Sequence, residues 1–264
     1  MLRFTRALIP LLLALGVLLA PASGVRAEAP GGELLYLALG DSVPAGTDLP
    51  DASSYAPRLG QYIANATGRS VNLLNRARAG ERSAGVLDHQ IGDVRAIQPE
   101  LVTLTVGAND LLVPGIQCAD ATFDGDTRTQ CAPGALLRAL PIFERNYRAI
   151  LRKLVNETGA TIVVTTYFNP FPRTSRCAPG TTDVALRLLN TTIEDVAAEF
   201  GDRDVVVDLA PLFKGHEGRE PDGWFSPSMS TPFACADIHP DATGHDAIAQ
   251  AIFGALASRV SLSQ

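Results

Sequence analysis

The chain has 264 residues, of which 46% are hydrophobic, and this is enough for one α/β domain with a sizeable core. Its 22 basic and 28 acidic side chains give a formal net charge of −6, which argues against nucleic acid as a partner. We therefore expect a single domain that does not bind nucleic acid.

The N-terminal segment, residues 1–27, is typical of a secretory signal peptide. Arg3 and Arg6 precede the apolar run ALIPLLLALGVLLA, which is shorter than the roughly 20 residues that a spanning helix needs. Val25 and Ala27 suit a cleavage site after Ala27, and a retained N-terminal anchor is the alternative. The sequence thus predicts a secreted or extracytoplasmic protein, residues 28–264, that does not insert stably into a membrane.

Strand-like and helix-like segments alternate along the mature chain. In chain order, period and punctuation predict strand 34–39, helix 53–67, strand 70–74, short helix 83–91, strand 101–106, helix 135–157, strand 160–166, helix 181–200, strand 204–208 and helix 241–258. Such alternation is typical of parallel strands joined by right-handed crossovers. We expect a three-layer α/β/α sandwich with a five-stranded parallel sheet in flavodoxin-like order.

Three connections are longer than simple turns, and all three follow the ends of predicted strands. They span residues 107–134, 167–180 and 209–240. Long loops in a compact domain are usually functional or disordered, and these should gather at one edge of the sheet. That edge is where we expect the site.

Four residues that suit nucleophilic catalysis follow predicted strands or precede the last helix. Ser42 ends the segment LYLALGDS, Gly80 lies in NRARAGERSAG, Asn109 follows a strand in LVTLTVGAND, and His239 lies in DIHPDATGH. A serine nucleophile needs a base for its proton and donors for the oxyanion. Taken singly, each residue has a structural reading as well: a helix cap, a loop glycine, an Asx turn or a bystander histidine.

Several neighbouring polar residues are interpreted as structural. Asp41 and Asp110 should satisfy backbone N–H groups of their turns. We interpret His216 and His245 as bystanders, and His89 as a solvated helix residue.

Together the four blocks resemble the GDSL esterases of the SGNH hydrolase superfamily, over about residues 35–250 and in the expected order. The resemblance implies that Ser42 is the nucleophile and that His239 is general base and then general acid. It also implies an oxyanion hole built from the Ser42 N–H, the Gly80 N–H and the Asn109 amide. No G-x-S-x-G motif occurs, which disfavours the α/β-hydrolase alternative.

One departure from the family concerns the group that orients the histidine. The family usually carries Asp three residues before the catalytic His, but this chain has Ala236 there, and the nearest acid is Asp237. Either Asp237 reaches the His239 ring, or the main-chain carbonyl of Ala236 accepts its hydrogen bond in a Ser–His dyad.

Four cysteines in an exported chain predict two disulfides rather than a metal site, because none lies in a C-x-x-C pair with histidines at zinc spacing. Three connectivities are possible for Cys118, Cys131, Cys177 and Cys235. We favour Cys118 with Cys131 and Cys177 with Cys235. No cofactor or metal is implied by the motifs of the chain.

Aromatic residues are concentrated in the expected crevice loops and suggest a hydrophobic acyl or aryl site, although most of them could simply pin those loops to the core. They are Tyr167, Phe168, Phe171, Phe213, Trp224, Phe225 and Phe233. The resulting hypothesis is a serine esterase or lipase, monomeric by default, that acts on small-molecule or lipid esters. An acyltransferase, a carbohydrate acetylesterase and a non-catalytic extracellular binding protein are the alternatives.

Overall fold

The computed structural model describes residues 32–49, 53–111, 133–171, 179–218, 222–226 and 238–259. The predicted signal peptide, residues 1–27, lies outside the described residues. The four cysteines lie outside them too, so their pairing stays a prediction.

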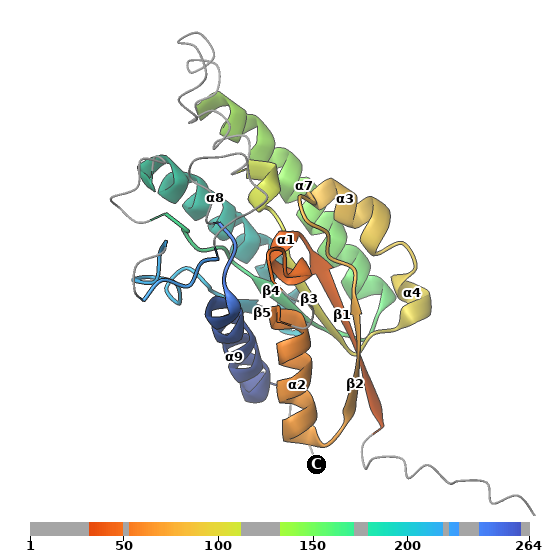
Figure 1. Ribbon diagram of the computed structural model, residues 1–264. Coiled ribbons are helices and arrows are strands. Elements are labelled where there is room, and N and C mark those ends of the chain that lie inside the picture. Colours follow the sequence, from red (N-terminus) through yellow and green to blue (C-terminus); the bar gives the residue numbers. More distant parts are fainter. Residues whose placement is uncertain are drawn as a thin grey trace, which may run out of the picture.

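Five parallel strands form the central sheet, in the order β2-β1-β3-β4-β5 (Figure 1). They are β1 (Glu33–Gly40), β2 (Ser70–Asn75), β3 (Leu101–Thr105), β4 (Thr161–Thr165) and β5 (Asp204–Val207). All of β3 is buried, as its apolar and β-branched residues predict for a central strand covered on both faces. The predicted sheet and its flavodoxin-like order are confirmed.

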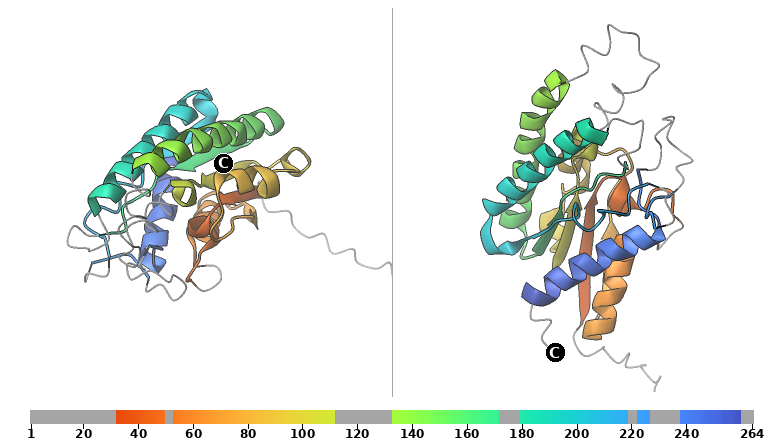
Figure 2. Two further views of the ribbon diagram at one scale, coloured as in Figure 1. Left: turned by 90° about the horizontal axis from the view of Figure 1, so that it is seen from above. Right: turned by 90° about the vertical axis from the view of Figure 1, so that its left-hand side faces the viewer.

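Helices cover both faces of this sheet, which confirms the predicted three-layer sandwich (Figure 2). The helices α2 (Tyr55–Thr67) and α9 (Ala242–Arg259) pack together on one face. The helices α7 (Pro133–Glu157) and α8 (Pro179–Ala198) pack together on the other. No helix in the described part of the chain is both long and apolar enough to span a bilayer.

Short helical turns complete the fold. They are α1 (Ser42–Ala45), α3 (Ser83–Gly85), the π-helical turn η1 (Val86–Gln90), α4 (Val94–Ile97) and the 3₁₀ turn η2 (Gly201–Arg203). Among them, α1, α4 and η2 were not predicted from the sequence pattern. The single helix predicted over 83–91 is therefore an α-turn that widens into a π-turn. This wider turn buries both Val86 and Gln90.

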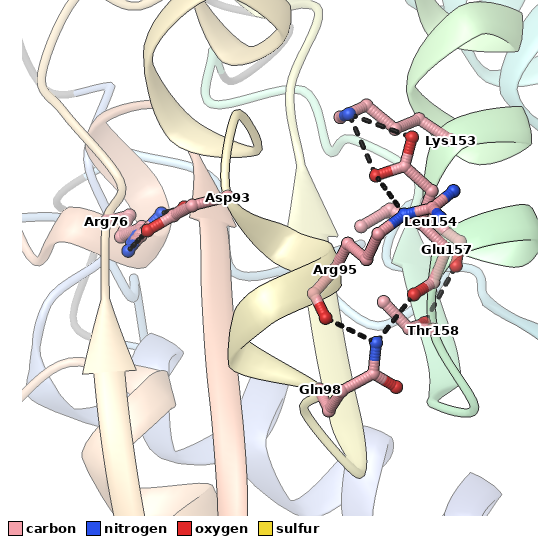
Figure 3. A network of polar contacts seen from close by, with 8 residues as sticks. All are labelled: Arg76, Asp93, Arg95, Gln98, Lys153, Leu154, Glu157 and Thr158. Carbon is pink, nitrogen blue, oxygen red and sulfur yellow. Dashed lines mark hydrogen bonds and ion pairs between the residues drawn. The ribbon is translucent and has the colours of Figure 1, made fainter.

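The segment after β2 continues beside β1 beyond the end of the strand. Arg76 N–H donates to the Ala38 carbonyl (2.9 Å) and Arg78 N–H to that of Gly40 (3.1 Å). The Arg76 guanidinium also pairs with Asp93 (Figure 3). It donates a further hydrogen bond to the Gln90 carbonyl (3.0 Å). These contacts hold the chain that leads to Gly80 next to the carboxyl end of β1.

Gln98, at the end of α4, is bound to the end of α7. The Gln98 side-chain amide donates to the carbonyls of Arg95 (2.6 Å) and Glu157 (2.8 Å), and Lys153 pairs with the Glu157 carboxylate (3.0 Å) (Figure 3). The connection from β2 to β3 is thus bound to β1 near its beginning and to the end of α7 near its end.

Candidate active site

Gly40, the last residue of β1, is required by close packing against β3. Its φ is +130°, and a Cβ at this position would lie 1.9 Å from the Thr105 carbonyl oxygen. The buried Gln90 side chain holds the same peptide, because it accepts from Gly40 N–H (2.8 Å) and donates to the Gly40 carbonyl (2.9 Å). The strand end that precedes Ser42 is therefore fixed from two sides.

Ser42 begins α1, the turn that follows β1. Asp41 caps this turn, since its side chain accepts from Val43 N–H (3.0 Å), and Gly46 ends the turn in the left-handed region. The predicted structural role of Asp41 is confirmed. The Ser42 N–H is the first of the helix and has no acceptor within it.

A buried carboxyl thus lies directly beside Ser42. The second Asp41 oxygen accepts a hydrogen bond from the hydroxyl of Tyr167, a residue that follows β4. Burial raises the pKa of Asp41 to about 7, although the hydrogen bonds from Tyr167 and Val43 oppose that shift. Asp41 therefore titrates close to neutral pH and ties the turn of Ser42 to β4.

Asn109 follows β3 and lies beside the Gly80 turn. Gly107, which precedes it, has a φ of +136°, and a Cβ there would lie 2.7 Å from Leu189 and 2.8 Å from Phe143. The Asn109 amide donates to the Glu81 carbonyl (2.9 Å). One of its two N–H groups is thus engaged with the residue after Gly80, and the other, which has no partner among the described residues, can donate to a ligand.

The Gly80 turn is fixed to the segment after β3 by a second contact. Asp110 accepts from both the Ser83 N–H (2.9 Å) and the Ser83 hydroxyl (2.6 Å), so it has a structural role as predicted, but its partner is the segment after Gly80 and not its own turn. Burial raises the pKa of Asp110, while the two Ser83 donors lower it. Gly80 itself is exposed, has a φ of +76° and is not among the residues that line the pocket described below.

His239 lies just before α9, and its backbone is paired with residues 224–226. Ser226 N–H donates to the His239 carbonyl (3.0 Å), and Asp241 N–H donates to the Trp224 carbonyl (2.8 Å). The flanking Pro240 forms an antiparallel bridge with Phe225. The ring of His239 is therefore carried by a fixed backbone, and the residue is buried.

The side-chain partner of His239 is Asp48. The Nδ1 atom of His239 lies 2.8 Å from Oδ2 of Asp48, a residue that the sequence analysis does not single out. Asp237 and Ala236, the two partners considered from the sequence, lie outside the described residues. Since Nδ1 carries at most one hydrogen, Asp48 occupies the position that we expected one of them to take.

Ser42, Asn109 and His239 line one pocket at the carboxyl edge of the sheet. The rest of its described lining is Asp41, Val43, Ala108, Tyr167, Phe168, Pro170, Phe171, Thr182 and Ile238. The hydrogen bonds of the described residues do not include one between Ser42 and His239; in apo enzymes such contacts are often loose and tighten with substrate. The structure thus brings together three of the four predicted residues and places the turn of the fourth against Asn109.

The aromatic residues predicted for the crevice divide into two groups. Tyr167, Phe168 and Phe171 line the pocket. Phe213 stacks on Phe168 with ring centroids 3.9 Å apart, and Phe225 packs edge-on against Phe168 at 5.5 Å. Trp224 packs against Phe213, so these last residues pin loops to the core, and Phe233 lies outside the described residues.

The remaining histidines lie away from the pocket. His245 is buried, and its Nδ1 accepts from Tyr55 N–H (3.1 Å) at the start of α2. Burial lowers the pKa of His245 to about 3. His216 stacks on Trp224 at 3.6 Å, and His89 is exposed, as predicted. Within the described ranges, no three His, Cys, Asp or Glu side chains are placed to hold a metal ion.

The fold and this pocket define a parallel α/β protein with a serine, an asparagine and a histidine at the carboxyl edge of its sheet. The chain belongs to the GDSL-like lipase/acylhydrolase family, whose model matches residues 38–247. The resemblance stated from the sequence is thereby confirmed. No curated protein sequence matches the chain.

Solved structures of the same fold include several ester hydrolases. The phospholipase A1 of Streptomyces albidoflavus is 21% identical with a TM-score of 0.66, and the comparison covers 86% of this chain and 99% of that one. The extracellular lipase of Streptomyces rimosus is 19% identical with a TM-score of 0.67, over 86% and 100% of the two chains. An acetylxylan esterase of Geobacillus stearothermophilus is 17% identical with a TM-score of 0.56, over 84% and 94%.

Proposed function

We propose that this protein is a serine ester hydrolase that acts on small acyl or lipid esters. The observation that carries the proposal is the convergence of Ser42, Asn109 and His239 on one pocket from three separate parts of the chain. Membership of the GDSL-like lipase/acylhydrolase family supports the same activity. The apolar lining, with Phe168, Phe171 and others, suits the acyl part of an ester.

In the acylation step of the proposed mechanism, Ser42 attacks the ester carbonyl. Its Oγ bonds to the carbonyl carbon while Nε2 of His239 accepts the hydroxyl proton. The bond to the leaving alcohol then breaks, and His239 returns that proton to the departing oxygen. The oxyanion is stabilised by the Ser42 N–H, the Gly80 N–H and the second N–H of the Asn109 amide.

Deacylation repeats these steps with water as the nucleophile. His239 accepts a proton from water as its oxygen bonds to the acyl carbon, and the bond to Ser42 Oγ then breaks. The proton moves from His239 to Oγ, which releases the carboxylic acid and restores the enzyme. An acyltransferase would form the same acyl-enzyme, but an alcohol would take the place of water. The oxygen of the alcohol would bond to the acyl carbon, the bond to Ser42 Oγ would break, and the proton of the alcohol would pass through His239 to Oγ.

We further propose that the protein works outside the cytoplasm, after removal of residues 1–27. The basic start and the short apolar run of that segment support this location. The lipase of Streptomyces rimosus, which has the same fold, is described as extracellular.

The proposal is tested by hydrolysis of p-nitrophenyl acetate, butyrate, octanoate and palmitate by the wild type and Ser42→Ala. We expect the variant to lose activity by at least roughly 10³-fold, because the nucleophile is removed. Ser70→Ala, which changes an exposed serine at the start of β2, should leave the rates unchanged. The proposal fails if the wild type is inactive on every ester or if Ser42→Ala is equally fast.

The alternatives are separated by product analysis. Addition of an alcohol acceptor should give free acid as the main product for a hydrolase and a new ester for an acyltransferase. Release of acetate from acetylated xylan, with little activity on long-chain esters, would identify a carbohydrate acetylesterase.

A further inference from the structure

We infer that Asp48 is the positioning residue of the catalytic histidine, so that the nucleophile and the orienting carboxylate are carried by the same short segment, residues 42–48. This inference rests on the proposed function of Ser42 and His239. It assigns the third member of the group to a residue on the segment that follows Ser42, rather than to the loop of the histidine.

The first argument is the geometry of the pair. The 2.8 Å distance between His239 Nδ1 and Asp48 Oδ2 is that of a charge-assisted hydrogen bond. Both side chains are largely buried, with exposed fractions of 8% and 10%. Such a bond is stronger here than in water, because the surroundings screen it less.

The second argument is the tautomer that this contact selects. A carboxylate accepts hydrogen bonds, so Nδ1 of His239 must carry the hydrogen. Nε2 is then the unprotonated nitrogen, which is the state that a general base for Ser42 requires. When His239 takes the proton of Ser42, the adjacent carboxylate stabilises the imidazolium that forms.

The third argument is how rigidly the turn holds Asp48. Thr47 N–H donates to the Ser42 carbonyl (3.1 Å), Gly46 N–H donates to that of Val43 (3.1 Å), and Leu49 N–H donates to that of Gly46 (3.1 Å). These bonds bring Asp48 back to the side of the pocket on which His239 lies. Asp48 itself has a φ of +66°, which is a left-handed conformation that Asn and Gly adopt readily.

This backbone conformation provides a clean test with Asp48→Asn and Asp48→Gly. Both replacements suit the φ of +66°, so neither should strain the turn, and thermal unfolding of each variant checks that it folds. Asp88→Asn is the matched control, since it removes an exposed carboxylate in η1. The measurements are kcat and KM for p-nitrophenyl butyrate and the proton NMR spectrum of protein with ¹⁵N-labelled histidine.

We expect kcat of both variants to fall at least about 10-fold, toward the ~10⁴-fold loss known for the triad acid of trypsin-like enzymes, with KM nearly unchanged. The chain has 4 histidines, and the downfield Nδ1–H signal that is lost in His239→Gln is assigned to His239. This signal should vanish in both Asp48 variants. It should persist in Asp88→Asn and in Ser42→Ala. If Asp48 had only a structural role, its replacement would not lower kcat at an unchanged KM and also abolish the Nδ1–H signal.

The inference is overturned if either Asp48 variant keeps kcat within about 10-fold of the wild type, or if the Nδ1–H signal persists in both. Failure of the proposed function looks different, because the wild type would then hydrolyse no ester. In that event the NMR measurement alone decides whether Asp48 accepts the hydrogen bond from Nδ1 of His239. Persistence of the signal overturns the pairing, and its loss supports it.

Discussion

The side chain of Gln90 forms two hydrogen bonds with the peptide of Gly40, one to its N–H (2.8 Å) and one to its carbonyl (2.9 Å). The two residues lie far apart in the sequence, yet this contact fixes the end of β1 immediately before Ser42. Gln90 is fully buried, so water cannot replace the bonds that it makes.

We predict that Gln90→Leu destabilises the protein by about 1–3 kcal/mol, because the Gly40 N–H is left buried without an acceptor. The Gly40 carbonyl keeps its bond from Arg78 N–H, which limits the loss. Urea unfolding measures the change. The control Gln61→Leu alters an exposed glutamine of α2 and should change the free energy of unfolding by less than about 0.5 kcal/mol. Equal effects of the two substitutions would contradict a special role for Gln90.

The buried Asp41 should make stability depend on pH. Its pKa is raised to about 7 in the folded protein, above the value of roughly 3.9 in the unfolded chain. Between these values the folded state binds more protons, so the free energy of unfolding falls as pH rises. Burial raises the pKa of Asp204 to about 6, and this effect has the same sign.

Asp41→Asn should therefore gain stability relative to the wild type between pH 5 and pH 8, by more than about 1 kcal/mol. Urea unfolding of both proteins at pH 5 and at pH 8 gives the four free energies of unfolding from which this gain is calculated. Asp88→Asn, with the same change of charge at an exposed site, should show almost none. A variant that tracks the wild type at both pH values would show that Asp41 is ionised at pH 5 already.

The buried His245 should make the free energy of unfolding depend on pH with the opposite sign to Asp41. Burial lowers its pKa to about 3 in the folded protein, against roughly 6.5 in the unfolded chain. The unfolded state binds more protons between these values, so stability is lost as pH falls from 6.5 toward 3. Protonation of Nδ1 would also remove the acceptor of the Tyr55 N–H.

For His245→Asn we expect lower stability at pH 7, because a buried ring is lost, but a smaller further loss between pH 7 and pH 4.5. Asn can still accept the Tyr55 N–H, and it does not titrate. Thermal or urea unfolding at both pH values tests this, with the exposed His89→Asn as the control. The prediction is refuted if wild type and His245→Asn lose the same free energy of unfolding on acidification.

The sheet and the site residues that follow its strands could be predicted because their signals are local. Apolar, β-branched runs alternate with longer amphipathic segments, and this fixes the order of the elements and the edge at which the strands end. Ser42, Asn109 and His239 each lie next to such an element in a block typical of the family. The boundaries of the strands agree with the structure to within one residue or so.

Asp48 and Gln90 could not be predicted, because their roles arise only from tertiary contacts. An acid after Gly-Thr is typical of an ordinary surface turn, and only the fold brings it to His239. Gln90 looked like one more polar residue of the helix predicted over 83–91. The π-turn that buries it has no distinct local signal, so its contact with Gly40 appears only in the structure.

The pairing of His239 with a carboxylate from outside its own loop has a consequence for the rest of that loop. Because Asp48 already contacts Nδ1 of His239, no acid is needed three residues before the histidine. Alanine, which this chain has there as Ala236, is then acceptable. The stretch that enters α9 then has only to place an imidazole beside Asp48, whose position is set by the segment that begins at Ser42.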